Sequence, residues 1–152
     1  KDDIFVSQFE SNHYLSPISL SDSINSEGYE FNSYIDPMEN YILFTAYGRK
    51  DGFGSGDLYI SYKTEDGVWS NAKNLGSTVN SVSMDYCPFV DHSTKTLYLT
   101  SKRSSFEKTK PFKSLKELLS DLSKSENGMS RVYQIKLNKV TLLSENVLPN
   151  AN

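Results

Sequence analysis

The stretch Asp57-Leu58-Tyr59-Ile60-Ser61 repeats a pattern met at the start of the chain, Asp3-Ile4-Phe5-Val6-Ser7. An aromatic residue follows each copy at a matching place, Tyr14 in the first case and Trp69 in the second. The match extends outward over residues 24–26 and 79–81, 30–36 and 85–91, and 42–45 and 97–100. A third copy begins at Val132-Tyr133. Matched apolar positions over so long a stretch indicate an internal repeat, and this repeat decides the fold.

Each full copy of the repeat is predicted to form four short strands separated by turns. Residues 36–40 form one turn signal, because Pro37 presets φ and its Asp and Asn neighbours bond their own backbone. Gly67 marks another turn, where a positive φ is needed. The predicted strands are 30–35, 41–46, 57–62 and 68–75 in the first full copy, and 85–90, 96–102, 131–137 and 140–147 in the second. The N-terminal strands 3–9 and 14–20 match the third and fourth strands of a copy.

This arrangement predicts an all-β fold made of β-propeller blades, about two and a half four-stranded antiparallel blades with one short helical insertion. The half blade is 1–20, and the full blades are 28–76 and 83–148, the latter with the insertion at 104–130. A β-sandwich is the alternative, but it gives no reason for a whole four-strand pattern to repeat. A closed ring needs about four to eight blades. We therefore expect residues 1–152 to be a partial propeller domain, either a fragment of a larger propeller or one of several chains that complete a ring.

The composition excludes some classes of partner. The net charge is −3 and the isoelectric point about 5.4, whereas a surface for nucleic acid needs clustered positive charge. The apolar runs are too short to span a membrane. The single cysteine, Cys87, cannot form an internal disulfide, and its position on an inner strand predicts a buried small residue.

One face of the predicted blades carries the longest polar loops. Connections alternate between the two faces of an up-and-down blade, so the loops between second and third strands share a face with the links between blades. This loop face consists of residues 21–29, 47–56, 76–84 and 104–130. Loops presented by a rigid scaffold are where binding residues concentrate, so we expect function on this face.

The insertion is predicted to contain a helix at 113–124. Apolar residues recur there at helical spacing, and Ser114 with Glu117 forms a capping box. One interpretation is that the leucine stripe packs against the rim of the propeller. The other is that the helix docks a partner or covers the central channel.

Glu30 and Asp85 are the leading candidates for ligand-binding residues, because both begin an innermost strand at the predicted mouth of the channel. The alternative is that each carboxylate pairs with Arg49 or Arg103 to brace neighbouring strands. Arg49 is itself a candidate, since arginine grips carboxylates with two parallel bonds. The remaining candidates are Asp51, Arg103, Asn25 and Asn80.

No catalytic residue and no cofactor is predicted from these patterns. Calcium is a weaker alternative, because Asp51, Asp57 and loop carbonyls supply the oxygen ligands it prefers. The glycines 52, 54 and 56 do not form a nucleotide loop, because they precede a strand and a phosphate cradle needs a helix N-terminus.

Residues 30–59 resemble the WD-like β-propeller repeat of TolB-type proteins. The resemblance rests on an acid and aromatic at Glu30-Phe31, an apolar strand at 41–46, a Gly-rich loop at 52–56, and Asp57-Leu58-Tyr59. The second copy adds Asp85 and Thr100-Ser101-Lys102-Arg103, but its Gly-rich loop is missing. The resemblance implies a non-enzymatic propeller of the bacterial envelope, periplasmic or extracellular, that binds a protein or a glycan. A propeller enzyme, either a glycoside hydrolase or lyase or the accessory propeller of a peptidase, is the alternative, and it would use carboxylates at the channel mouth.

Overall fold

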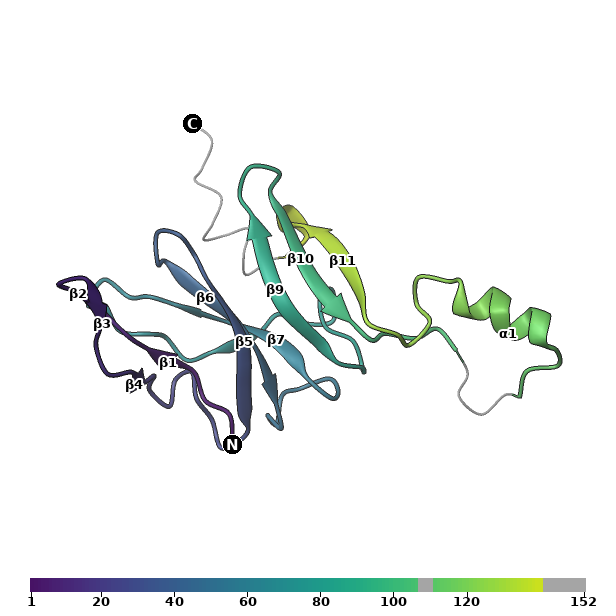
Figure 1. Ribbon diagram of the computed structural model, residues 1–152, viewed down its shortest axis with the longest axis horizontal. Helices are drawn as coiled ribbons and strands as arrows, with labels where there is room; N and C mark the ends of the chain where they lie inside the picture. The colour runs from purple at the N-terminus through teal and green to yellow at the C-terminus, as the bar shows by residue number, and fades with distance from the viewer. Residues whose placement is uncertain (107–110, 141–152) are drawn as a thin grey trace.

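The computed structural model describes residues 1–106 and 111–140, and these form antiparallel β-sheets with one α-helix (Figure 1). The prediction of an all-β fold with a short helical insertion is therefore confirmed. No closed sheet occurs among the described residues. Three parts correspond to the sequence repeat and are named here the half unit (1–20), the first full unit (28–76) and the second full unit (83–148).

The first full unit is a four-stranded sheet in the order β5(Tyr29–Ile35), β6(Tyr41–Tyr47), β7(Asp57–Tyr62), β8(Lys73–Asn74). The Asp36 carboxylate forms the predicted turn between β5 and β6, accepting from the backbone N–H of Met38 at 3.2 Å and of Asn40 at 3.1 Å. Gly67 has φ +77° in the turn after β7, as the sequence predicted. The fourth strand is much shorter than the predicted 68–75.

The second full unit is a three-stranded sheet in the order β9(Asp85–Asp91), β10(Thr96–Ser101), β11(Arg131–Lys136). A short 3-10 helix, Leu137–Lys139, follows β11. The predicted fourth strand, 140–147, lies outside the described residues except for Val140. Both full units carry a register shift at the same place in the inner strand, where Asn32 and Cys87 have φ of +49° and +50°.

Cys87 corrects one prediction, because its side chain is exposed and not buried. The irregular backbone at this position breaks the simple alternation of a strand, in which successive side chains point to opposite faces. Val90, three residues on, is buried instead.

The half unit contains two pairs of very short strands. β1(Phe5–Val6) pairs with β4(Ile18–Ser19), and β2(Phe9–Glu10) pairs with β3(His13–Tyr14) across a tight hairpin. Among the described residues, β1 pairs with another strand, β4, along one edge only. Its counterpart β7 pairs with a strand along both edges.

The first full unit is buried on both faces, because alternate side chains of its strands point to opposite sides. Ile42, Phe44 and Tyr59 pack against Ile4 and Ile24, at the junction with the half unit. The opposite face packs against the second full unit, whose β9 contacts β5, β6 and β7. That second cluster includes Leu43, Leu58, Ile60, Val90, Leu97 and Leu99.

The helix α1(Leu115–Leu122) lies apart from both sheets, at the end of the long axis (Figure 1). Ser114 caps it as predicted, accepting from the Glu117 N–H at 3.2 Å. The interpretation that its leucines pack against the sheets is wrong: Leu115 is 70% exposed and Leu119 56%. The insertion carries α1 beyond the reach of the sheet cores, so its apolar side has no sheet to cover. No described helix is long and apolar enough to cross a membrane.

Candidate functional site

Glu30 is held by a set of contacts that joins three segments of the chain. Its side chain is fully buried and accepts from the Ser26 backbone N–H at 3.0 Å and from Arg49 Nε at 3.2 Å. Arg49 also donates to the carbonyl of Ile24 and lies 4.8 Å from the centre of the Tyr59 ring. The carboxylate therefore ties the link before β5 to the loop after β6.

The second full unit repeats this brace. The buried Asp85 accepts from the Ser81 hydroxyl at 2.7 Å and from Arg103 Nη2 at 2.9 Å. Arg103 donates to the Val79 carbonyl at 2.8 Å and stacks 4.7 Å from the Tyr133 ring. The structure thus brings together the two acid–arginine pairs that the sequence suggested, Glu30 with Arg49 and Asp85 with Arg103. Both pairs brace neighbouring segments, and neither carboxylate points into an open site.

Asn25 and Asn80 form a second repeated contact. The Asn25 side chain accepts from the Ile4 N–H at 2.8 Å and donates to the Ile4 carbonyl at 3.0 Å. Asn80 makes the same two bonds with Leu58, also at 2.8 and 3.0 Å. Each amide gives the buried N–H of Ile4 or Leu58 its acceptor, because a buried backbone N–H must be bonded. The two carbonyls accept in addition from the backbone N–H groups of Leu20 and Leu75. Both side chains are buried and engaged within the chain.

The Gly-rich loop packs tightly against the link to the next unit. A Cβ at Gly54 would lie 2.2 Å from the Val82 carbonyl oxygen, so only glycine fits there. Asp57 lies under the loop and accepts from the Phe53 N–H and from Asn74 Nδ2. Burial raises the pKa of the Asp57 carboxyl above its ordinary value, and these hydrogen bonds offset part of that rise.

Asp51 contributes to the same loop through its carboxylate, which accepts from the Tyr59 hydroxyl at 2.8 Å. Asp51 and Asp57 remain the calcium candidates that the sequence suggested. Among residues 1–106 and 111–140, no group of three or more His, Cys, Asp or Glu side chains is arranged to hold a metal ion.

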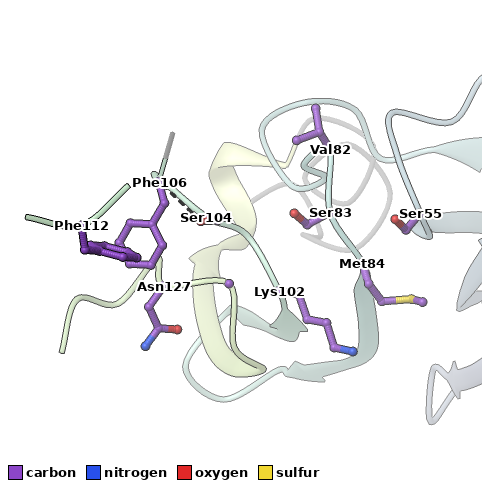
Figure 2. A pocket seen from close by; sticks show the side chains of 10 residues that line it. Ser55, Val82, Ser83, Met84, Lys102, Ser104, Phe106, Phe112 and Asn127 are labelled. Carbon is purple, nitrogen blue, oxygen red and sulfur yellow. Dashed lines mark hydrogen bonds between the residues drawn. The ribbon is translucent and has the colours of Figure 1, made fainter. Parts of the chain in front are cut away.

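One pocket lies where three segments of the loop face meet (Figure 2). We call it the insertion pocket. It has a volume of about 550 Å³, within the range typical of ligand sites. Its walls come from the Gly-rich loop, the link before β9 and both ends of the insertion, namely Ser55, Val82, Ser83, Met84, Lys102, Ser104, Phe106, Phe112, Asn127 and Gly128.

Lys102 is the one charged side chain in this lining. It is exposed, and its ammonium group makes no hydrogen bond or ion pair with the described residues. Its backbone N–H donates to the Met84 carbonyl at 2.9 Å, which fixes the base of the side chain. Among residues 1–106 and 111–140, no carboxylate belongs to the lining, so the described part of the pocket carries one positive charge.

Phe106 and Phe112 form the apolar end of the pocket (Figure 2). Their rings meet edge to face, with centres 6.4 Å apart and planes at 88°. Asn127 also lines the pocket, and its Nδ2 donates to the Leu122 carbonyl at 2.6 Å while its Oδ1 accepts from the Met129 N–H at 2.9 Å. The Asn127 side chain is therefore engaged within the protein.

The insertion pocket is lined mainly by residues of the predicted loop face, but none of the predicted ligand-binding residues belongs to its lining. Glu30, Asp85, Arg49, Arg103, Asn25, Asn80 and Asp51 all lie outside the insertion pocket. Lys102, Ser83 and Phe112 line this candidate pocket and are not among the residues predicted from the sequence. A signal for Phe112 was available, because it lies in the insertion, where the repeat is interrupted.

Comparisons with known proteins found no matching family model, and no curated protein or solved structure with significant similarity. The resemblance to TolB-type repeats therefore stays a prediction from the residues.

Proposed function

We propose that this chain is a non-catalytic binding module of β-propeller type, which engages a ligand through the insertion pocket. The observation that carries the proposal is the contrast in how polar side chains are used. The repeated acids, arginines and asparagines form hydrogen bonds inside the protein. In contrast, Lys102, Ser55 and Ser83 line the insertion pocket, and their side chains make no hydrogen bond with the described residues.

The propeller architecture is the finer part of this proposal. It is supported by the sequence repeat, by two full units packed face against face, and by an acid–arginine brace at equivalent positions in both. Phe5, the counterpart of Tyr59, is 56% exposed, and β1 has a free edge among the described residues. We propose that further blades, from the same or another chain, cover this edge. The resemblance supports a periplasmic or extracellular location.

An enzyme would need groups placed for chemistry. Glycoside hydrolysis uses two carboxylates that flank the substrate. Glu30 and Asp85, the candidates for that role, are buried and paired with arginine. No observation on the described residues favours the enzyme over the binding module.

The proposal is tested with labelled chain applied to a glycan array and to an array of short peptides. We expect ligands that lose binding when Phe112 is replaced by Ala, and no chemical change in those ligands by mass spectrometry. A control substitution, Asp66→Ala, lies in the turn 65–67, outside the pocket. Equal loss in both variants, or turnover of a bound ligand, would count against the proposal.

A further inference from the structure

We infer that one specific element docks on the free edge of β1, namely an apolar antiparallel strand followed by a Gly-rich loop, with the chemistry of residues 41–56. This inference rests on the blade architecture in the proposed function, and it names the part of a further blade that contacts the half unit. It is carried by three observations at equivalent positions of the half unit and the first full unit.

The first observation is the unpaired edge of β1. In the first full unit, β7 pairs with β8 on one side and with β6 on the other, where Tyr59 lies opposite Phe44. β1 pairs with β4 in the same register that β7 keeps with β8. The side of β1 without a strand among the described residues is therefore the side that β6 covers in the first full unit. A strand that docks there runs antiparallel to β1, as β6 runs to β7.

The second observation is the exposure of the β1 side chains. Phe5 is 56% exposed and Val6 48%, whereas their equivalents Tyr59 and Ile60 are fully buried. In the first full unit, the Phe44 ring of β6 stacks on Tyr59 with ring centres 6.2 Å apart. Removal of apolar surface from water drives association. The docking strand is therefore expected to be apolar and to carry an aromatic ring at the place of Phe44.

The third observation is the carboxylate of Asp3, the equivalent of Asp57. Asp57 accepts from the Phe53 N–H of the Gly-rich loop. Oδ1 of Asp3 is buried, yet the Asp3 carboxylate accepts no hydrogen bond from the described residues, and Lys1 Nζ lies 3.3 Å from it. A buried acceptor without a donor is unfavourable. A loop that follows the docking strand, as residues 52–56 follow β6, would bring backbone N–H groups to Asp3.

A single element of the first full unit supplies all three contacts that the half unit lacks. β6 pairs with the strand edge, its side chains cover the ring, and the loop after it bonds the carboxylate. Pairing of β1 with β1 of a second copy would satisfy the strand edge alone. It would place another half unit next to Asp3, and residues 1–20 contain no glycine.

The test grafts the chain's own element onto the half unit. A copy of residues 29–56 replaces Lys1-Asp2 and is joined to Asp3, as Gly56 precedes Asp57 in the first full unit. Hydrogen exchange of residues 3–7 is measured by mass spectrometry. We expect exchange about tenfold slower or more than in the unmodified chain, because amides in a paired strand exchange only after local opening. A matched graft with Leu43→Ser and Phe44→Ser in the copy is expected to give no protection.

The variant Asp3→Ala separates the contribution of the loop from that of the strand. In the grafted chain it is expected to speed exchange of residues 3–7 severalfold, because the loop N–H groups lose their acceptor. In the unmodified chain it is expected to leave exchange unchanged, because no described residue donates a hydrogen bond to Asp3. An equal effect in both chains would overturn the assignment of the loop.

Unchanged exchange in the grafted chain, or equal protection from both grafts, would overturn the inference. If the graft does not fold, a synthetic peptide of residues 40–56 is added to the unmodified chain, and a lack of protection at residues 3–7 then overturns it. Protection that rises with the concentration of the unmodified chain would identify a second copy instead, and would also overturn it. The array experiment on the insertion pocket uses the unmodified chain, so the binding role proposed above stands or fails separately.

Discussion

The loops that follow β6 and β10 occupy equivalent places in the two full units, yet they do different things. The loop after β6 is short and Gly-rich, and it packs onto the link at Val82. The loop after β10 is expanded into the insertion 104–130, and it leaves an open pocket with α1 beyond it. Where the repeat is kept, side chains hold the units together. Where it is interrupted, a pocket opens whose lining includes Lys102, a side chain without an ion pair to the described residues.

The largest effect is expected from breaking a repeated brace. Glu30→Ala removes a fully buried carboxylate and leaves Arg49 and the Ser26 N–H without their partner. We expect a loss of about 3 kcal/mol in the free energy of unfolding, because the remaining charge is largely buried. Urea unfolding measures it, with the exposed Glu27→Ala as control. A loss below about 1 kcal/mol would show that the brace contributes little.

The next largest effect is expected at the tight contact between loop and link. Gly54→Ala places a methyl group against the Val82 carbonyl, and we expect a cost of roughly 2 kcal/mol from overpacking. Gly67→Ala is the comparison, because a Cβ there meets open space and costs only the positive φ, about 1 kcal/mol. Thermal or urea unfolding of both variants decides the order. Equal costs would mean that the loop moves away freely from the link.

The asparagine contacts test whether equivalent positions are energetically equivalent. Asn25→Ala and Asn80→Ala each leave one buried backbone N–H unpaired, whereas the carbonyls of Ile4 and Leu58 keep their backbone hydrogen bonds. We expect each variant to lose about 2 kcal/mol in the free energy of unfolding. Asn71→Ala, at an exposed position, is expected to change stability little. Equal losses in the two variants would show that the two asparagine contacts are energetically equivalent. A loss for Asn25→Ala that is smaller by more than about 1 kcal/mol would show that the contact with the half unit is weaker.

The smallest effect is expected in the turn after β9 and depends on pH. Hydrogen bonds from the Ser93 and Thr94 hydroxyls and backbone lower the pKa of Asp91 to about 2. A folded pKa below the ordinary value of 3.8 stabilises the fold above that value, and the contribution is lost as pH falls toward 2. Asp91→Asn is therefore expected to lower the melting temperature at pH 5 but not at pH 2, relative to wild type. A constant difference across this range, or the same trend in an Asp66→Asn control, would contradict the assignment.

The candidate site was only partly predictable from the sequence, because the charged residue types that bind ligands are also the types that form the repeated structural braces. The sequence marks Glu30 as the start of an innermost strand and Arg49 as an arginine beside the Gly-rich loop, and it also allows the two to pair. Recurrence of an acid and an arginine at matching places is a sign of shared structure, as the second brace at Asp85 shows. Lys102 precedes Arg103 directly, but the sequence gives no reason to expect that one pairs internally and the other faces a cavity.

The sequence alone determined the strand order, the turns at Asp36 and Gly67, the helix cap at Ser114 and the face that carries the long loops. These features follow from local rules: alternation of side chains, proline and glycine backbone preferences, and hydrogen bonds between near neighbours. Tertiary structure decided which side chains are engaged and which are available. The exposure of Cys87, the position of α1 away from the sheets and the pocket at Lys102 depend on how distant segments pack, and sequence spacing does not encode those distances.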